Sequence, residues 1–310
     1  MMTQIELIPD EPRPLTRMAR MLWADKFALV AALFLLLVLV LALIGPWWLD
    51  AVAQKQNLRG RNAPPFDWSR GWLWVLGADA LGRPLLARII VAAQNTMLVA
   101  AGAVIGSAIM GTVLGLVAGY AGRRTGMVIM RLADVIMSFP SLLLAVVVLY
   151  ILGPSVLNLV IVLAITRIPV YLRTTRAEVM EIRERMFVQA AQVMGASAPR
   201  IIFRHILPVV LPTLMTIATL DFAFVMLAES ALSFLGIGIQ PPEITWGLMI
   251  AQGKQYLTNA WWLSFWPGLA IILTTLSLNL LSNWMRIALD PTQRWRLEMR
   301  QSKTKTEVKA

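Results

Sequence analysis

Long apolar runs alternate with short polar stretches along almost the whole chain. Each run has about the length that crosses the hydrocarbon core of a bilayer as a helix. The pattern therefore predicts an all-α integral membrane protein with six transmembrane helices, and an even number of spans places both termini on one side of the membrane. The predicted spans cover residues 27–49, 95–118, 127–152, 156–172, 209–235 and 263–287.

The second apolar run carries glycines at intervals of about one helical turn. Small residues in this arrangement let two helices approach closely inside a membrane. We therefore expect this span to pack tightly against another one. The glycines are Gly102, Gly106, Gly111 and Gly115.

The remaining segments are more polar than the spans. Residues 1–26 form a tail in which Pro9, Pro12 and Pro14 discourage regular structure. Residues 50–93 separate the first span from a core of five spans at residues 94–287, and residues 288–310 form a second tail.

Composition supports the membrane class and excludes several others. Of the 310 residues, 58% are hydrophobic, 15% are charged and none is cysteine, which excludes disulfides and cysteine metal sites. The net charge of +11 comes from basic residues that flank the apolar runs. Nucleic-acid binding would instead require a basic face on a folded domain, so this distribution argues against it. The sequence has no GxxxxGK[ST] phosphate-binding loop and no catalytic cluster, so we expect no ATP hydrolysis by this chain, no cofactor and no metal.

The distribution of arginine predicts the orientation. The loop between the fourth and fifth spans, at about residues 173–208, is rich in arginine, whereas the loop after the fifth span has only Lys254. The positive-inside rule therefore places the arginine-rich loop and both tails in the cytoplasm and residues 50–93 outside. Six basic residues within residues 50–90 favour the opposite orientation, but the arginine-rich loop and the two tails together carry more basic residues. The loop arginines are Arg173, Arg176, Arg183, Arg185, Arg200 and Arg204.

The first span has an alternative interpretation. Ala51, Val52 and Ala53 resemble a signal-peptidase site, so residues 27–49 are also a candidate for a cleaved signal peptide. The run is longer than a usual signal core, and the Pro-Trp-Trp sequence at residues 46–48 suits an interfacial anchor. We favour a retained span.

The cytoplasmic loop contains a polar, helix-forming stretch at residues 189–208. Helix formers precede Gly195, which stands where a helix C-terminus favours a left-handed residue. Ser197 suits the N-cap of a second helix, and Pro199 suits its first turn. The pattern predicts a helix, a sharp bend and a second helix that ends near Pro208. His205 is the only histidine, and we assign it no chemistry.

Charged residues within the predicted spans are candidates for function because a charge in the membrane is costly. Arg167, Asp221 and Glu229 either pair with partners or line a path for a zwitterionic solute. Outside the membrane, Asp79 and Arg83 either form a salt bridge within the loop or support the docking of a partner protein.

The stretch at residues 189–208 resembles the loop that bacterial ABC importer permeases present to their ATPase subunits. The consensus is Glu-Ala-Ala, three residues, Gly, nine residues, Ile, one residue and Leu-Pro. Gln189 replaces the glutamate and His205 the isoleucine, and the loss of charge at residue 189 weakens any charge-assisted contact. The matching residues are Ala190, Ala191, Gly195, Leu207 and Pro208.

Further stretches are similar to the dipeptide and oligopeptide group of these permeases. Residues 76–83 resemble its LGTDxLGRD motif, although Ala78 replaces the threonine and Pro84 follows where aspartate is usual. The group's MRxxD, FP, LSFLGLG, PP, WG and FPG motifs have counterparts in order along the chain. Near the C-terminus, residues 279–281 and 289–291 agree with the group, whereas Ser-Asn-Trp at residues 282–284 replaces Gly-Asp-Gly.

The resemblance implies a type I ABC importer permease fold in a bacterial inner membrane. It also implies a second related permease, two ATP-binding subunits and an extracytoplasmic solute-binding protein as partners. The solute stays open among peptides, nickel complexes, glutathione and opines. One alternative is a secondary transporter driven by an ion gradient through Asp221 and Glu229, although the sequence shows no inverted repeat. A membrane scaffold that transports nothing is another alternative.

Overall fold

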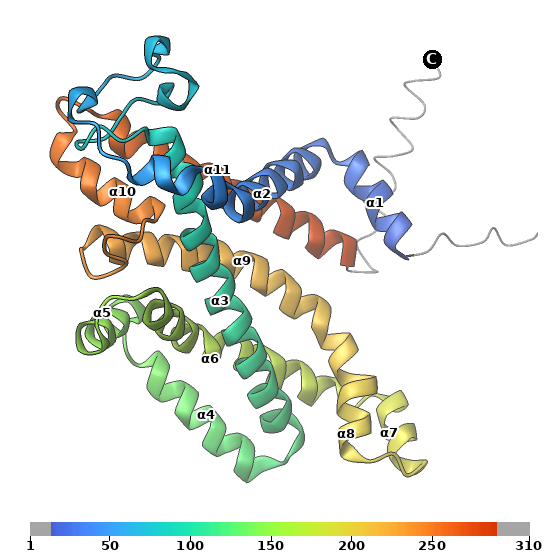
Figure 1. Ribbon diagram of the computed structural model, residues 1–310. Coiled ribbons are helices and arrows are strands. Elements are labelled where there is room, and N and C mark those ends of the chain that lie inside the picture. The colour runs from blue at the N-terminus through green and yellow to red at the C-terminus, as the bar shows by residue number, and fades with distance from the viewer. Residues whose placement is uncertain (1–13, 290–310) are drawn as a thin grey trace, which may run out of the picture.

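The computed structural model describes residues 14–289, which form a bundle of helices without a β-sheet (Figure 1). Residues 1–13 and 290–310 lie outside the described residues. The outer parts of both predicted tails, including the Asp290-Pro291 motif, fall there. Within the described range the all-helical prediction is confirmed.

Within residues 14–289, five long helices are apolar enough to cross a membrane. The five are α2 (Lys26–Gln54), α3 (Leu85–Tyr120), α6 (Val156–Ile182), α9 (Leu207–Phe234) and α11 (Trp262–Leu289). In Figure 1, α3 runs across the direction of α9 and α11, and the short α10 (Trp246–Gly253) lies at one end of the molecule with α7 (Met186–Val193) and α8 (Ala198–Ile201) at the other.

The third predicted span, residues 127–152, is not one straight helix. It consists of α4 (Arg123–Met137) and α5 (Ser141–Leu152), which meet at a bend of 83°. Pro140 explains the break because proline lacks an N–H donor and disfavours helical backbone at the residue before it. The bundle therefore has six spans only if this bent pair is one of them.

Two other expectations about helix extent need correction. α6 continues through Ile182, so the first part of the predicted loop at residues 173–208 extends a spanning helix. The tail expected to be irregular contains α1 (Pro14–Ala24), where proline is tolerated because it occupies the first turn. Met21 on α1 is buried against Trp284 of α11.

The predicted tight packing of the glycine-rich span is confirmed. A Cβ atom added at Gly111 would lie 2.6 Å from the side chain of Tyr171, and one at Gly115 would lie 2.5 Å from that of Thr175. Gly102 similarly faces Val160. The glycine face of α3 therefore lies directly against α6.

The buried apolar side chains form two main clusters. The larger one surrounds the first half of α3 and includes side chains from α2, α6, α9, α11 and the short α10 (Trp246–Gly253). The smaller one joins the other ends of α3, α6 and α9 to two short helices, α7 (Met186–Val193) and α8 (Ala198–Ile201). α10 and α7 thus mark opposite ends of the bundle (Figure 1).

Candidate functional sites

The segment between α6 and α9 has the predicted helix, bend and helix. Gly195 has φ +82°, its N–H donates to the carbonyl of Gln192, and that of Ala196 donates to the carbonyl of Ala191. These bonds close the C-terminus of α7 through a left-handed residue. Ser197 stands at the N-cap position of α8 but makes no side-chain bond there, and Pro199 lies in the first turn.

The second helix of this segment does not end where the sequence pattern indicated. α8 continues through a π-helical turn, Ile202–Ile206, directly into α9. Pro208 lies in the first turn of α9, directly after the π-helical turn, and does not end the helix. A displacement of α8 is therefore carried directly into a spanning helix.

α7 has one buried side and one exposed apolar side. Val188 and Ala191 are buried in the smaller apolar cluster. Met186 is 86% exposed, Val193 is 89% exposed and Met194, just after the helix, is 81% exposed. Apolar side chains that are exposed together indicate a contact surface. We call these three residues the α7 apolar surface.

The residues aligned with the permease consensus differ in exposure. Among the matches, Ala191 is buried and Leu207 is half-buried, whereas Ala190, Gly195 and Pro208 are exposed, as is Gln189 at the position of the consensus glutamate. Ala191 therefore packs inside the permease, whereas Ala190, Gly195 and Pro208 lie on the surface, where another protein can contact them.

A cavity of about 490 Å³ lies beside α7 and is lined by Tyr120, Arg183, Glu184, Gln189 and Gln192. Arg183 donates to the carbonyl of Gly119 at 3.1 Å and so ties α6 to the end of α3. Gln189 donates to the carbonyl of Glu184 at 3.1 Å. The cavity therefore offers amide and charged groups that a partner's polar side chain can meet.

Arg167 and Asp221 form an ion pair between α6 and α9. The guanidinium of Arg167 also lies over the ring of Phe224, 4.3 Å from its centroid. Asp221 is buried, which makes the pairing important because an isolated buried charge is costly. The pairing interpretation of these two charges is confirmed, and a role in a translocation path stays a prediction.

Glu229 does not belong to this pair. It is fully buried two turns further along α9, where the hydroxyl of Ser233 donates to its carboxylate at 2.8 Å. The three candidate path residues therefore do not form one cluster within the described chain.

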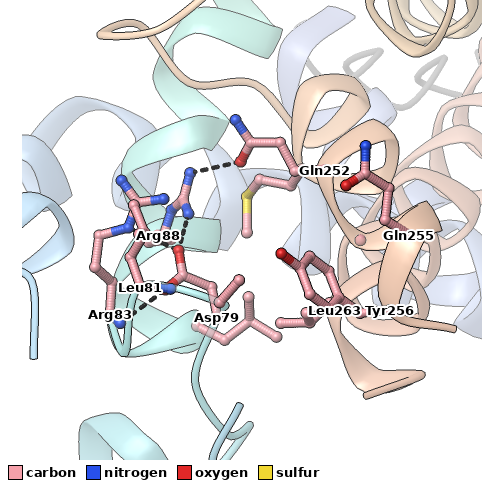
Figure 2. Close-up of a pocket in the computed structure, with 12 residues that line it drawn as sticks. Asp79, Leu81, Arg83, Arg88, Gln252, Gln255, Tyr256 and Leu263 are labelled. Atoms are coloured by element: carbon pink, nitrogen blue, oxygen red, sulfur yellow. Dashed lines mark hydrogen bonds and ion pairs between the residues drawn. The ribbon is translucent and has the colours of Figure 1, made fainter. Parts of the chain in front are cut away.

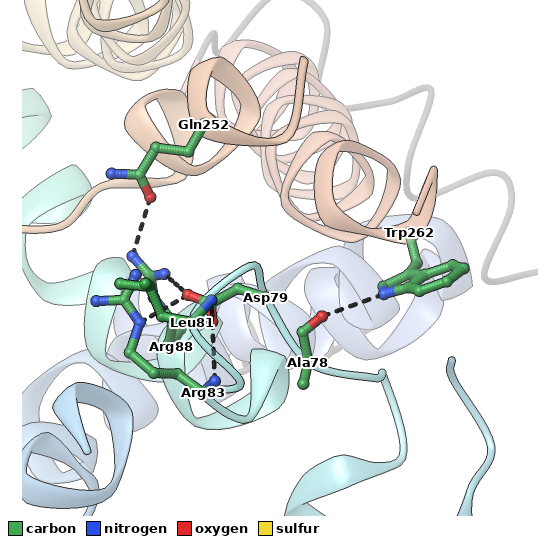
Figure 3. A network of polar contacts seen from close by, with 7 residues as sticks. All are labelled: Ala78, Asp79, Leu81, Arg83, Arg88, Gln252 and Trp262. Carbon is green, nitrogen blue, oxygen red and sulfur yellow. Dashed lines mark hydrogen bonds and ion pairs between the residues drawn. The ribbon is translucent and has the colours of Figure 1, made fainter. Parts of the chain in front are cut away.

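At the end of the bundle opposite α7, Asp79 is the centre of a buried charge network (Figure 3). Its carboxylate accepts from Nε of Arg83 at 2.6 Å, from the backbone N–H of Leu81 at 2.9 Å, and from the guanidinium of Arg88. Arg88 also donates to the side chain of Gln252 on α10 at 3.2 Å. The predicted Asp79–Arg83 salt bridge is confirmed, and it is one part of a larger network.

Sequence reasoning missed Arg88 and Gln252. Asp79 and Arg83 are four residues apart, which local spacing can indicate, whereas Gln252 is 164 residues from Arg88. Nothing in the local pattern relates α10 to the start of α3.

The network lines one wall of a pocket of about 280 Å³, which Tyr256 and Leu263 face from the other side (Figure 2). Asp79 is 6% exposed and Arg88 is 2% exposed. Asp79 is therefore placed to hold the loop to the bundle rather than to meet a partner directly, and a role for Asp79 and Arg83 in docking stays a prediction.

Comparison with known proteins agrees with this architecture. Residues 111–295, more than half of the chain, match the family described as binding-protein-dependent transport system inner membrane component. The chain is 41% identical to the di/tripeptide transport system permease protein DppC of Pseudomonas aeruginosa (strain UCBPP-PA14) over 282 residues, which cover 90% of this chain and 93% of that protein.

Two further relatives come from other bacteria. The dipeptide transport system permease protein DppC of Alkalihalophilus pseudofirmus is 37% identical over 267 residues, 86% of each chain. The probable D,D-dipeptide transport system permease protein DdpC of Escherichia coli (strain K12) is 34% identical over 296 residues, 94% of this chain and 98% of that protein. The chain therefore belongs to the family of binding-protein-dependent transport system inner membrane components, which are permease subunits of ABC importers.

Proposed function

We propose that this chain is the permease subunit through which an ABC importer passes short peptides across a bacterial inner membrane. Its partners are a second related permease, two ATP-binding subunits and an extracytoplasmic solute-binding protein. Both termini and α7 face the cytoplasm, which agrees with the many arginines around α7. The names of the relatives, which are di/tripeptide and dipeptide permeases, support the solute class.

The α7 apolar surface carries the proposal for ATPase coupling. Met186, Val193 and Met194 are each more than 80% exposed, so burial against a partner gives a favourable contact. Val188 and Ala191, on the other side of α7, lie in the smaller apolar cluster, to which α6, α8 and α9 also contribute side chains. A partner that moves α7 therefore acts on the cluster in which two spanning helices meet.

This arrangement supports a division of labour. The sequence has no phosphate-binding loop, so ATP hydrolysis belongs to the partner subunits. The Arg167–Asp221 pair joins α6 and α9, and both helices contribute side chains to the apolar cluster that holds α7. We propose that rocking of these helices opens the path, with Arg167, Asp221 and Glu229 as candidate residues along it.

The experiment compares two glycine variants in the complex expressed with its neighbouring reading frames. Gly195→Asp places a Cβ and a charge on the α7 bend, where φ is +82° and no atom lies within 4 Å of the added Cβ. Gly153→Asp is the matched control because φ is also +82° and space is also open there, but this residue lies between α5 and α6. The measurements are ATPase subunits recovered with the tagged chain and ATP-dependent uptake of a labelled dipeptide in proteoliposomes.

We expect Gly195→Asp to insert normally but to lose ATPase recovery and uptake, and Gly153→Asp to keep both. Normal uptake by Gly195→Asp would refute the coupling role. Recovery of the ATPases without dipeptide uptake in the wild type would refute the peptide assignment and keep the importer. Membership of this family argues against a secondary transporter driven by an ion gradient. Uptake by the chain in the absence of ATP would support that alternative instead.

The binding-protein dock has its own test. Arg83 is the more exposed member of the Asp79 pair, with 18% of its side chain accessible. We propose that charge reversal at Asp79, at Arg83 and at both lowers uptake. Unchanged uptake in all three variants contradicts a docking role.

A further inference from the structure

A third polar cavity lies against α4 and shares no lining residue with the two cavities described above. It has a volume of about 370 Å³ and is formed by one side of α4 and by Arg176 of α6. We call it the α4 arginine pocket. Its lining residues are Arg123, Met127, Met130, Arg131, Asp134 and Arg176.

Positive charge exceeds negative charge in this pocket. Asp134 is the only acidic lining residue, and it already pairs with Arg173 at 2.6 Å and more distantly with Arg131 at 3.8 Å. Within residues 14–289, Arg123 and Arg176 form no ion pair, and the Nε atom of Arg176 is buried without an acceptor. The pocket therefore holds guanidinium donors that lack a counter-ion.

The N-terminus of α4 adds to this positive potential. α4 begins at Arg123 after Gly122, which provides no side-chain cap, and its first turn contains no acidic residue. The first N–H groups of a helix have no acceptor within the helix and carry a partial positive charge. Arg123 begins α4 and also lines the pocket. The partial positive charge of the helix N-terminus and the charges of the arginines therefore act in the same place.

Beside the pocket, α4 presents an apolar stripe. Val128, Leu132 and Val135 recur at helical spacing and are 63%, 64% and 59% exposed. Gly126 and Ala133 are the buried residues of this helix. Helices with an exposed apolar stripe next to basic side chains lie at membrane interfaces, where the stripe meets acyl chains and the basic groups meet headgroups.

We propose that the α4 arginine pocket binds the phosphate of an anionic phospholipid, whose acyl chains lie along Val128, Leu132 and Val135. The guanidinium fork matches phosphate oxygens in geometry and charge. The adjoining apolar stripe favours a lipid over soluble phosphate. This proposal does not depend on which solute the importer carries.

The test measures lipid retention by the purified full-length chain. The chain is placed in nanodiscs of dioleoylphosphatidylcholine that contain increasing fractions of dioleoylphosphatidylglycerol, and the retained lipid is quantified by native mass spectrometry. These two lipids share acyl chains and differ in headgroup charge. The variant is Arg123→Gln with Arg176→Gln, and the matched control is Arg59→Gln with Arg61→Gln, two exposed arginines of the loop before α3 that carry the same total charge.

We expect the wild type to prefer phosphatidylglycerol and the Arg123/Arg176 variant to lose roughly 25-fold of that preference, because each arginine near a charged surface contributes about fivefold. The control should keep the wild-type preference. Equal retention of both lipids by the wild type, or an equal loss in the control, would overturn the proposal.

Two further arms separate the assignment from misfolding and from soluble phosphate. Asp134→Asn removes the competing carboxylate and should raise the preference about fivefold, a gain that misfolding cannot produce. A lower preference in this variant would count against the site. Inorganic phosphate should leave phosphatidylglycerol bound, and its displacement by inorganic phosphate would reassign the pocket to a soluble anion.

Discussion

Around Asp79 the protein buries charged side chains and pairs them, whereas on α7 it exposes apolar side chains and leaves them uncovered. The Asp79 network joins the loop before α3 to α3 itself, through Arg88, and to α10, through Gln252. α7 is held by two small buried residues, Val188 and Ala191, and by a glycine bend. The charged groups at the Asp79 end therefore find their partners within this chain, whereas the apolar side chains at the α7 end are left for a partner protein to bury.

The largest expected effect is on the Asp79 network. Asp79→Asn leaves the buried guanidinium of Arg88 without its counter-ion, so we expect a loss of about 3–5 kcal/mol of stability. Asp67→Asn is the matched control, since Asp67 lies in the same loop and pairs with Arg70 at 3.1 Å, but both side chains are about one third exposed. Melting in detergent, followed by tryptophan fluorescence, measures both variants. Equal melting temperatures for Asp79→Asn and the wild type would show that the network is not structural.

The next effect concerns association rather than stability. Val193→Ser with Met194→Ser removes two exposed apolar side chains of the α7 apolar surface, so the melting temperature should stay nearly constant. Recovery of ATPase subunits should fall about tenfold or more, as expected when apolar anchors of an interface are removed. Quantitative co-purification at several salt concentrations measures this. Loss of stability without loss of ATPase recovery would place these side chains in the permease itself.

A smaller gain is expected at Gln189. Gln189→Glu restores the charge of the consensus and should strengthen ATPase binding by about fivefold through a charge-assisted bond. Gln192→Glu is the control because Gln192 lines the same cavity and gains the same charge. Titration of the ATPase subunits onto the immobilised permease compares the two. An equal gain in both variants would indicate a general charge effect rather than a specific contact.

The smallest effect is a pH dependence at Asp67. Hydrogen bonds donated by the side chain and backbone of Ser69 lower the pKa of Asp67 below its ordinary value of 3.8. A lowered pKa in the folded state means that the contribution of Asp67 is present above pH 3.8 and is lost as the pH falls through the folded pKa. The difference in melting temperature between wild type and Asp67→Asn, already small at pH 7, should therefore vanish in acid. A difference that grows in acid would contradict the assignment.

Features with a local cause were predictable from the sequence. The positive φ of Gly195 was predictable because a run of helix-forming residues ends at this glycine. The Asp79–Arg83 pair was predictable because the two residues are four positions apart. The membrane spans follow from the length of the apolar runs. Even the bend at Pro140 has a local cause, although the apolar run around it suggested one continuous span.

The features that define the candidate sites required the tertiary structure. The proximity of Arg88 to Gln252 and the pairing of Arg167 with Asp221 depend on which helices become neighbours, and hydropathy does not specify that choice. The same holds for the α4 arginine pocket, where Arg176 of α6 meets α4.

The sequence by itself therefore determined the class of protein, its apolar runs and the location of the α7 segment, because these depend on local composition and spacing. Only the tertiary structure decided that Asp79 is buried, that α8 continues into α9 and that Val193 and Met194 are exposed. Burial and ion pairing are properties of packed surfaces from distant parts of the chain, so they exist only once the helices have come together.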